Sequence, residues 1–254
     1  MAFEKIVIHN RNVEARVKAF ENNSDIDNKE KKDIKEFLRL CDLGKINKGK
    51  KLSRSRQLKY LDVLRIPFTY FKKDTAQITL KEVEQFDSDL SKDKILNKQT
   101  GKPLAQNTKV EIRKLFKIYL RWKLMNSPVK FQKFTDWWDT TYKSKTPDYL
   151  TEKEVIALFD GCKNVAERFL VTVLFDSGAR IQEFLNLRLA DITEPSKEFP
   201  YFMFDFKDEF AKMDGNGKGR GRKIGLYWVR SEKAIKDYLE SLESTKKEDL
   251  LFSL

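Results

Sequence analysis

Residues 150–191, LTEKEVIALFDGCKNVAERFLVTVLFDSGARIQEFLNLRLAD, decide how the second half of this chain folds. Thr151 and Glu154 have the spacing of a capping box, which predicts that a helix begins there. Gly161 is placed to end that helix. The apolar run that follows predicts a buried second helix, which stops at Gly178 because glycine accepts the left-handed conformation of a helix C-cap.

Arg180 comes directly after this turn, at the start of another helix, and Glu183 follows three residues later. Residues three apart share one face of a helix, so the two side chains can meet. A planar guanidinium has parallel donors that can grip two oxygens of a phosphate at once. The alternative is a surface arginine at a helix start that does nothing more than pair with Glu183.

The order Ser177-Gly178-Ala179-Arg180, Glu183, Leu187-Arg188 and Asp191 resembles the first conserved box of the tyrosine recombinases, the integrase family. In that family the arginine of this box binds the scissile phosphate and stabilises the charge that grows on it during strand cleavage. The resemblance implies that Arg180 is catalytic and that Glu183 supports it. The capped helix upstream favours this interpretation over the surface arginine.

Two segments after Asp191, residues 200–206 and 223–229, are rich in aromatic and branched residues and predict two strands. The basic, glycine-rich loop between them has no following helix, which argues against a nucleotide-binding P-loop and an NTPase. In the tyrosine recombinases this hairpin carries a lysine that protonates the leaving 5′ oxygen. The resemblance implies Lys218 for that role, with Lys212 as second choice; an ordinary solvated lysine is the alternative.

The first part of the chain predicts helices only. Apolar periodicity and capping residues predict helices from about Asp27 to Cys41, from Ser53, from Thr79 and from about Asn107. Pro67 is expected to bend or end the second of these, because proline removes a backbone donor.

The fold class expected from these patterns is mainly α with a small β-sheet. We place a domain boundary near residues 140–147, which gives a helical domain of residues 1–145 and a second domain of residues 146–254. Their order resembles that of the tyrosine recombinases. It implies a helical core-binding domain followed by a partial α+β catalytic domain.

The charge of the chain indicates a nucleic-acid partner, since the net charge is +12 and the pI is about 9.4. One basic run leads into the predicted helix at Ser53, and further cations lie on the helix that begins near Asn107. An ordinary solvated face is the alternative. The candidate DNA contacts are Lys45, Lys48, Lys50, Lys51, Arg54, Arg56, Lys59, Arg113, Lys117 and Arg121.

Cys41 and Cys162 each stand in an apolar helical pattern, so we expect two small core residues and neither a disulfide nor a metal site. No apolar run approaches the length that crosses a membrane. The N-terminus carries charges where a signal peptide needs an apolar core. A cytoplasmic, intracellular protein with no membrane contact is expected.

By resemblance, the complete protein is a site-specific DNA recombinase that breaks and rejoins DNA through a 3′-phosphotyrosine, without a metal or another cofactor. The family's His-x-x-Arg pair is not matched, since the only histidine is His9, and Tyr238 lies upstream of where that second box begins. We therefore expect the N-terminal portion of an integrase, which binds double-stranded DNA but does not cleave it alone. The partners implied are the remaining catalytic portion and, in the complete enzyme, a homo-tetramer on DNA.

Other functions stay open from the sequence. A non-catalytic DNA-binding accessory protein would use the same fold without chemistry. Charge alone is also compatible with an RNA-binding protein. A type IB topoisomerase shares much of the catalytic fold, but resembles the N-terminal helical part less well.

Overall fold

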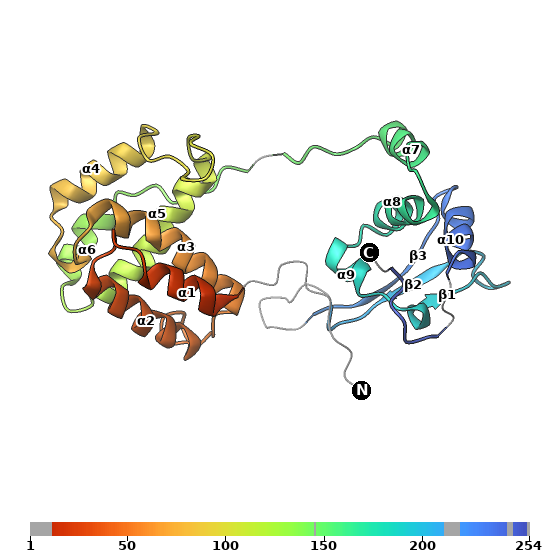
Figure 1. Cartoon of the computed structure of the whole chain (residues 1–254), viewed down its shortest axis with the longest axis horizontal. Coiled ribbons are helices and arrows are strands. Elements are labelled where there is room, and N and C mark those ends of the chain that lie inside the picture. The colour runs from red at the N-terminus through yellow and green to blue at the C-terminus, as the bar shows by residue number, and fades with distance from the viewer. Residues whose placement is uncertain (1–11, 145, 211–218, 243–245, 253–254) are drawn as a thin grey trace. The chain divides into compact units, whose positions relative to one another are not determined.

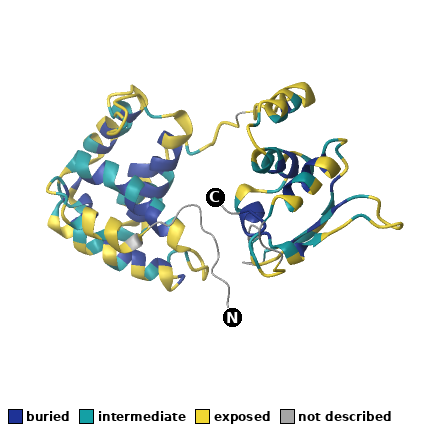
Figure 2. Ribbon diagram, turned by 45° about the vertical axis from the view of Figure 1, so that its right-hand side comes forward, coloured by how far each residue is buried: buried dark blue, intermediate teal, exposed yellow. Residues whose placement is uncertain are grey.

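The structure is a computed structural model that describes residues 12–144, 146–210, 219–242 and 246–252. The chain divides into two compact units, the helical unit (residues 11–146) and the mixed unit (residues 147–254). Buried residues gather within each unit separately (Figure 2). Each unit is therefore described by itself.

The four helices that the sequence predicts in the helical unit begin within one residue of their expected starts, while the helices Val13–Glu21 and Pro128–Thr135 were not predicted. Asp27 caps the second helix and Ser53 the third, and Thr79 forms a capping box with Glu82 at the start of the fourth. Its elements are α1 (Val13–Glu21), α2 (Asn28–Asp42), α3 (Arg54–Phe71), η1 (Thr75–Gln77), α4 (Leu80–Ser91), α5 (Gln106–Lys123) and α6 (Pro128–Thr135) (Figure 1).

Helix α3 passes through Pro67 and continues to Phe71, so of the two expected outcomes, a bend or an end, the structure excludes the end. A proline inside a helix costs about 3 kcal/mol, because a hydrogen bond is lost and the ring crowds the preceding turn. Leu64 and Phe68, on either side of Pro67, are both fully buried in the core of the unit. Burial of two such side chains offsets a cost of this size.

The mixed unit combines short helices with a three-stranded antiparallel sheet of order β1-β2-β3. The predicted fold class, mainly α with a small β-sheet, is therefore confirmed. No helix in the described part of the chain is both long and apolar enough to span a membrane. The elements are α7 (Glu152–Asp160), α8 (Val165–Ser177), α9 (Ile181–Leu185), η2 (Leu189–Asp191), β1 (Ile192–Thr193), β2 (Met203–Phe206), β3 (Arg222–Gly225) and α10 (Ser231–Glu240).

The strands are shorter than the predicted segments, because the chain leaves the sheet to meet α8. The backbone N–H of Trp228 donates to the carboxylate of Asp176 at 2.8 Å instead of to a neighbouring strand. The Ser231 hydroxyl donates to the same carboxylate at 2.6 Å. Arg230 occupies the N-cap position of α10, and Ser231 is the first residue of that helix.

Helix α8 lies in the core of the mixed unit. Phe169 on α8 stacks on Tyr238 of α10, with ring centroids 4.1 Å apart, so Tyr238 is a core residue of the mixed unit. The Tyr238 hydroxyl donates to the carbonyl of Leu251 at 2.8 Å. Leu251 in turn donates its N–H to the carbonyl of Leu187 at 2.7 Å, which ties residues 246–252 to the segment after α9.

The two cysteines lie in different surroundings. Cys41 is fully buried in the helical unit, and burial raises the pKa of its thiol to about 12. Cys162 is only partly buried, and its thiol donates to the carbonyl of Leu158 at 3.3 Å. The expectation of a core residue is thus confirmed for Cys41 and wrong for Cys162, which follows the end of α7.

Candidate functional site

A sharp turn at Gly178 sets the position of Arg180. Gly178 ends α8 with φ of +58°, the left-handed conformation that the sequence predicts for it. The N–H of Ala179 donates to the hydroxyl of Ser177 at 3.1 Å, which closes the turn. Arg180 then stands at the N-cap position of α9.

Glu183 holds Arg180 from within the core. Its Oε1 accepts a hydrogen bond from Arg180 Nη1 at 2.8 Å, and its Oε2 accepts one from the Arg180 backbone N–H at 3.0 Å. The side chain of Glu183 is 1% exposed, while that of Arg180 is 57% exposed. A buried carboxylate therefore fixes an arginine whose guanidinium still faces solvent, as the spacing of the two residues predicts.

Arg222 is a third member of this cluster, and sequence reasoning missed it. Its Nη2 donates to Glu183 Oε2 at 3.1 Å. As the first residue of β3, Arg222 pairs with Phe206 on β2, and its guanidinium carbon lies 5.1 Å from the centroid of the Phe206 ring. Several other cations stand in the same loop, so nothing in the sequence singles Arg222 out; only the fold brings it to Glu183.

The Glu183 carboxylate is ionised in this setting. Burial alone would raise its pKa, but hydrogen bonds from the Arg180 backbone and from the guanidinium groups of Arg222 and Arg180 outweigh burial and hold the pKa below its usual range. Two cations then face one anion, and the cluster keeps an excess positive charge. Such a cluster attracts an anion.

The remaining residues of the motif shape the backbone. Asp191 Oδ2 accepts from the N–H of Arg188 at 2.9 Å, and Asp191 Oδ1 lies 3.2 Å from Lys207 Nζ. These contacts fix the turn of η2 that leads into β1. Lys218 and Lys212, the two candidates for the hairpin lysine, lie outside the residues that the structure describes.

In the helical unit, a basic loop (residues 44–52) leads into α3. Gly44 takes φ of +75°, and the N–H of Gly49 donates to its carbonyl at 2.9 Å. A Cβ on Gly44 would lie 2.7 Å from the carbonyl of Gly49, so the loop closes only with glycine at this position. Ser53 then caps α3, whose N-terminal end carries partial positive charge. The exposed cations of the loop and of the first turn of α3 are Lys45, Lys48, Lys50, Lys51 and Arg54.

Arg56 and Lys59, one turn further along α3, share a carboxylate. Arg56 Nη1 lies 3.4 Å from Oε1 of Glu111 on α5, and Lys59 Nζ contacts the same oxygen. Glu111 is 8% exposed at its side chain, while both cations are about 40% exposed, at 42% and 41%. Part of their charge is therefore balanced within the unit.

The basic face expected on α5 is not formed, because α4 and α6 pack against that helix. Arg113 is buried, and its Nε donates to Asp87 of α4 at 2.5 Å, so the expectation of a DNA-facing Arg113 is wrong. Lys117 Nζ donates to the carbonyl of Thr135 on α6 at 3.0 Å. Arg121 is exposed, with its guanidinium carbon 5.5 Å from the ring centroid of Phe131.

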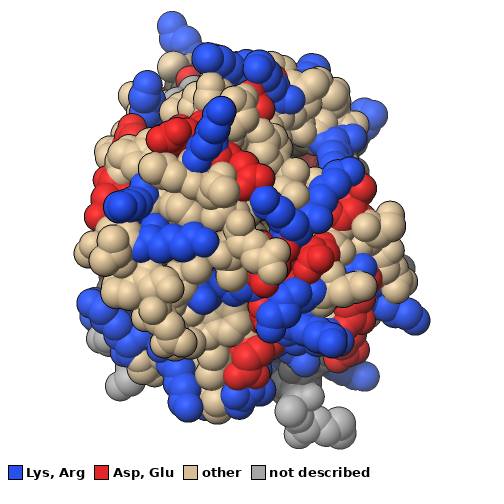
Figure 3. Space-filling model, turned by 90° about the vertical axis from the view of Figure 1, so that its left-hand side faces the viewer, with Lys and Arg blue, Asp and Glu red and all other residues tan. Residues whose placement is uncertain are grey.

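Charge is mixed on the face drawn in Figure 3, where Lys and Arg side chains stand among acidic side chains without merging into one basic surface. The candidate contacts that keep exposed or half-exposed side chains are the basic loop with Arg54, the pair of Arg56 and Lys59, and Arg121.

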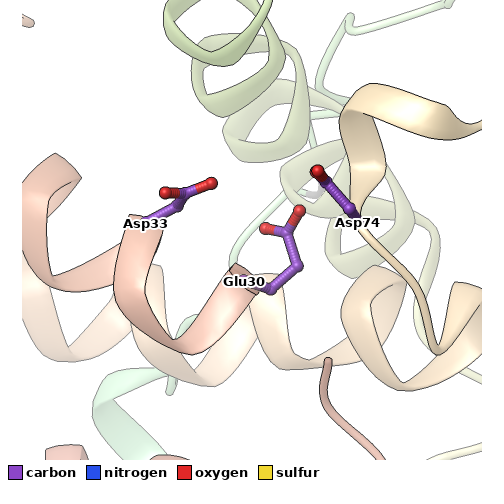
Figure 4. Close-up of side chains that lie close together, drawn as sticks. All are labelled: Glu30, Asp33 and Asp74. Atoms are coloured by element: carbon purple, nitrogen blue, oxygen red, sulfur yellow. The ribbon is translucent and has the colours of Figure 1, made fainter. Parts of the chain in front are cut away.

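Glu30, Asp33 and Asp74 point toward one another in the helical unit (Figure 4). Lys123 Nζ lies 3.0 Å from Glu30 Oε1 and 2.8 Å from Asp74 Oδ1, and it also contacts Asp33. The ammonium group stands where a metal ion would bind. The donor set therefore suits a buried lysine, and the cluster holds α2, η1 and α5 together.

The comparisons with known proteins leave the family open. No family model matches the chain, and no curated protein matches it. Among solved structures, a crystal structure of XerA recombinase aligns with 88% of this chain and 69% of that chain, at 17% sequence identity and a TM-score of 0.32. A TM-score this low carries no argument, so a functional conclusion depends on the site itself.

Proposed function

We propose that this chain binds double-stranded DNA and contacts a backbone phosphate through Arg180, as part of a site-specific recombinase of the tyrosine type. The observation that carries the proposal is an exposed guanidinium held in place by a buried carboxylate, directly after the left-handed turn at Gly178. The guanidinium of Arg113, by contrast, is buried and closed to a partner.

Arg180 would act by gripping the phosphate at the bond to be cut. Glu183 fixes one edge of the guanidinium, and a guanidinium has five N–H donors, so Glu183 does not exhaust them. A donor fixed in advance stabilises charge on a phosphate without reorganising during the reaction. The basic loop would add contacts to the phosphate backbone that position the protein without reading sequence.

Salt-dependent binding tests the DNA partner. Each neutralised phosphate lowers the logarithm of affinity by about 0.9 per tenfold rise in salt. We expect fluorescence anisotropy with a labelled duplex to give a slope of several units, and Lys48→Ala with Lys51→Ala to reduce it by about two. Equal competition by structured RNA, or a slope near zero, would contradict a duplex-DNA partner.

Ethylation interference tests Arg180 in a way that does not require cleavage. A duplex site is first selected by repeated binding from a random pool, and single phosphates are then ethylated. We expect ethylation of one particular phosphate to weaken DNA binding by the unaltered chain. The same ethylation should not weaken binding by Arg180→Ala or Arg180→Lys. Overall affinity should change little, because most phosphate contacts lie elsewhere.

Arg230→Lys is the matched control. Arg230 belongs to the same unit and pairs with a carboxylate, that of Asp160, but lies outside the Glu183 cluster. Its replacement should leave the interference pattern unchanged. If Arg180→Ala also leaves the interference pattern unchanged, Arg180 does not contact a phosphate and only stabilises the turn.

A further inference from the structure

Arg222 joins the cluster of Arg180 and Glu183 from the start of β3. Its side chain is 34% exposed, and its Nη2 reaches the Glu183 oxygen that also accepts the Arg180 backbone N–H. Arg180 Nη1 donates to the other oxygen of the same carboxylate. Both guanidinium groups therefore donate a hydrogen bond directly to the buried Glu183 carboxylate.

We propose that Arg222 is a second phosphate-binding residue of this site, so that Arg180 and Arg222 hold one phosphate between them on the buried Glu183 carboxylate. The inference rests on the function proposed above and names a further residue for it. Two guanidinium groups on one carboxylate leave an uncompensated positive charge at the protein surface. A phosphate diester, with one negative charge and two non-bridging oxygens, matches that charge and offers one acceptor to each arginine.

The start of β3 is built to keep Arg222 in place. A Cβ on the preceding Gly221 would lie 2.3 Å from the carbonyl oxygen of Phe206 and 2.7 Å from the N–H nitrogen of Asp208, so only glycine lets the two strands approach this closely. The Gly221 N–H donates to the Asp208 carboxylate. The Arg222 guanidinium lies over the buried Phe206 ring, and this contact restricts the rotamers of the Arg222 side chain.

An open pocket of about 650 Å³ also borders Arg222, but it does not suit an anion. Its lining carries the carboxylates of Asp205, Asp208 and Glu209 and as many cations, those of Lys207, Arg222 and Lys223. The pocket therefore offers a phosphate no excess positive charge. The arginine pair, rather than this pocket, is therefore the proposed binding position.

The test uses inorganic phosphate as probe and the side-chain Nε–Hε signals of the arginines in the ¹⁵N-labelled chain. The signals are assigned by through-bond experiments, so that the result does not depend on a variant that folds. We expect the Arg180 and Arg222 signals to move together, with one dissociation constant, while the Arg230 signal stays in place. Movement of the Arg180 signal alone, or of neither, would overturn the proposal.

A variant gives a second, independent measurement. Arg222→Lys keeps the charge but loses the planar fork, and we expect the dissociation constant for inorganic phosphate to rise about tenfold, the effect of one charge-assisted hydrogen bond. Arg230→Lys should leave it unchanged. An unaltered dissociation constant in Arg222→Lys, with an unaltered melting temperature, would mean that Arg222 only holds Glu183.

A duplex arm separates this inference from the proposed function. If the chain binds duplex DNA while phosphate moves only the Arg180 signal, the function stands and the role of Arg222 fails. If phosphate moves both signals and the chain does not bind duplex DNA, the two-arginine site stands as a site for free phosphate and the DNA function fails.

Discussion

Two buried glutamates, one in each unit, meet opposite surroundings. Glu30 in the helical unit is fully buried, and its donors are Lys123, Tyr119 and the backbone and hydroxyl of Thr75. Glu183 in the mixed unit is 2% exposed, and its donors are two arginines. Both carboxylates are saturated with hydrogen bonds, yet the groups that saturate them differ in exposure and in charge balance.

The exposure of the donors separates a structural cluster from a candidate binding site. The Lys123 side chain is 6% exposed and is surrounded by three carboxylates, so no donor faces solvent. Arg180 and Arg222 belong to a cluster with one carboxylate and present guanidinium groups to solvent. A buried carboxylate alone therefore does not identify a binding site. Whether the cluster can bind an anion depends on the exposure and the charge of the donors around the carboxylate.

The largest expected effect follows from removing Lys123. Lys123→Met leaves three carboxylates without their shared cation, and breaking a buried ion pair costs about 3–5 kcal/mol. We expect the free energy of unfolding of the helical unit to fall by that amount. Urea denaturation, monitored by hydrogen exchange of the α2 and α5 backbone amides, measures the change.

Lys29→Met is the control for that experiment, because Lys29 pairs with Asp33 at 3.2 Å while its side chain is 60% exposed. A surface substitution of this kind changes stability by about 0.5 kcal/mol at most. If Lys123→Met cost no more than Lys29→Met, the cluster would not hold the helices together. If Lys123→Met does not fold, Glu30→Gln is the second variant. It removes one charge of the cluster and keeps the shape of the Glu30 side chain.

Glu183→Gln should have a smaller effect on stability and a specific one on binding. The carboxamide loses its charge-assisted bonds to two arginines and turns a donor toward one of them. Because the arginine side chains are 57% and 34% exposed, solvent screens these bonds, and each is worth about 1 kcal/mol. We expect a lower melting temperature and a raised dissociation constant for inorganic phosphate. Glu30→Gln should lower the melting temperature without changing phosphate binding. Equal effects of the two variants on the dissociation constant for phosphate would contradict the proposed difference between the two clusters.

Local signals in the sequence predicted much of this fold. The capping boxes at Thr79 and Thr151, the left-handed cap at Gly178 and the approach of Arg180 to Glu183 each depend on residues within one helical turn. Such patterns are legible because neighbours in sequence must be neighbours in space.

Contacts between distant residues were not predictable in the same way. Arg222 lies 39 positions from Glu183, and Lys123 lies 93 positions from Glu30. Arg113 was expected on a basic face, but only the packing of α4 on α5 shows that its partner is Asp87. Charge patterning identifies cations without telling which of them the fold encloses.

The two clusters should respond differently to alkali. The pKa of Glu183 is lowered in the fold, so its contribution is complete above its unfolded value of about 4.3 and disappears as pH falls through the folded pKa. Burial alone would lower the pKa of Lys123, but Glu30, Asp33 and Asp74 raise it above its usual value. Its contribution is therefore complete below about pH 10.4 and declines as pH rises toward the folded pKa.

Thermal melting across this range checks the signs. The difference between the unaltered chain and Glu183→Gln should be constant from pH 5 to 9 and shrink in acid. The difference from Lys123→Met should also be constant over that range; it should shrink in alkali, where Lys123 loses its proton, and in acid, where Asp74, which Lys123 holds ionised, takes up a proton. A Glu183→Gln difference that shrank in alkali, or a Lys123→Met difference that did not, would count against the assignment.

The smallest expected effect concerns two threonine capping boxes, one at the start of α4 in the helical unit and one at the start of α7 in the mixed unit. Thr79 donates its N–H to Glu82 at 2.8 Å, and Thr151 donates its N–H to Glu154 at 2.7 Å. Replacing either threonine by alanine should cost about 1 kcal/mol. Glu82 also accepts from Lys73 at 2.6 Å, and this hydrogen bond, with those from Thr79, lowers its pKa to about 2.

Because Lys73 keeps the Glu82 carboxylate near the helix start, Thr79→Ala should cost a few tenths of a kcal/mol less than Thr151→Ala. Hydrogen exchange at the first-turn amides of α4 and α7 measures each loss locally. High salt screens the exposed Lys73–Glu82 pair, so the gap between the two variants should close as salt rises toward 1 M. If the gap were independent of salt, it would belong to the packing of the two helices rather than to the ion pair, and the two boxes would differ for a reason other than charge.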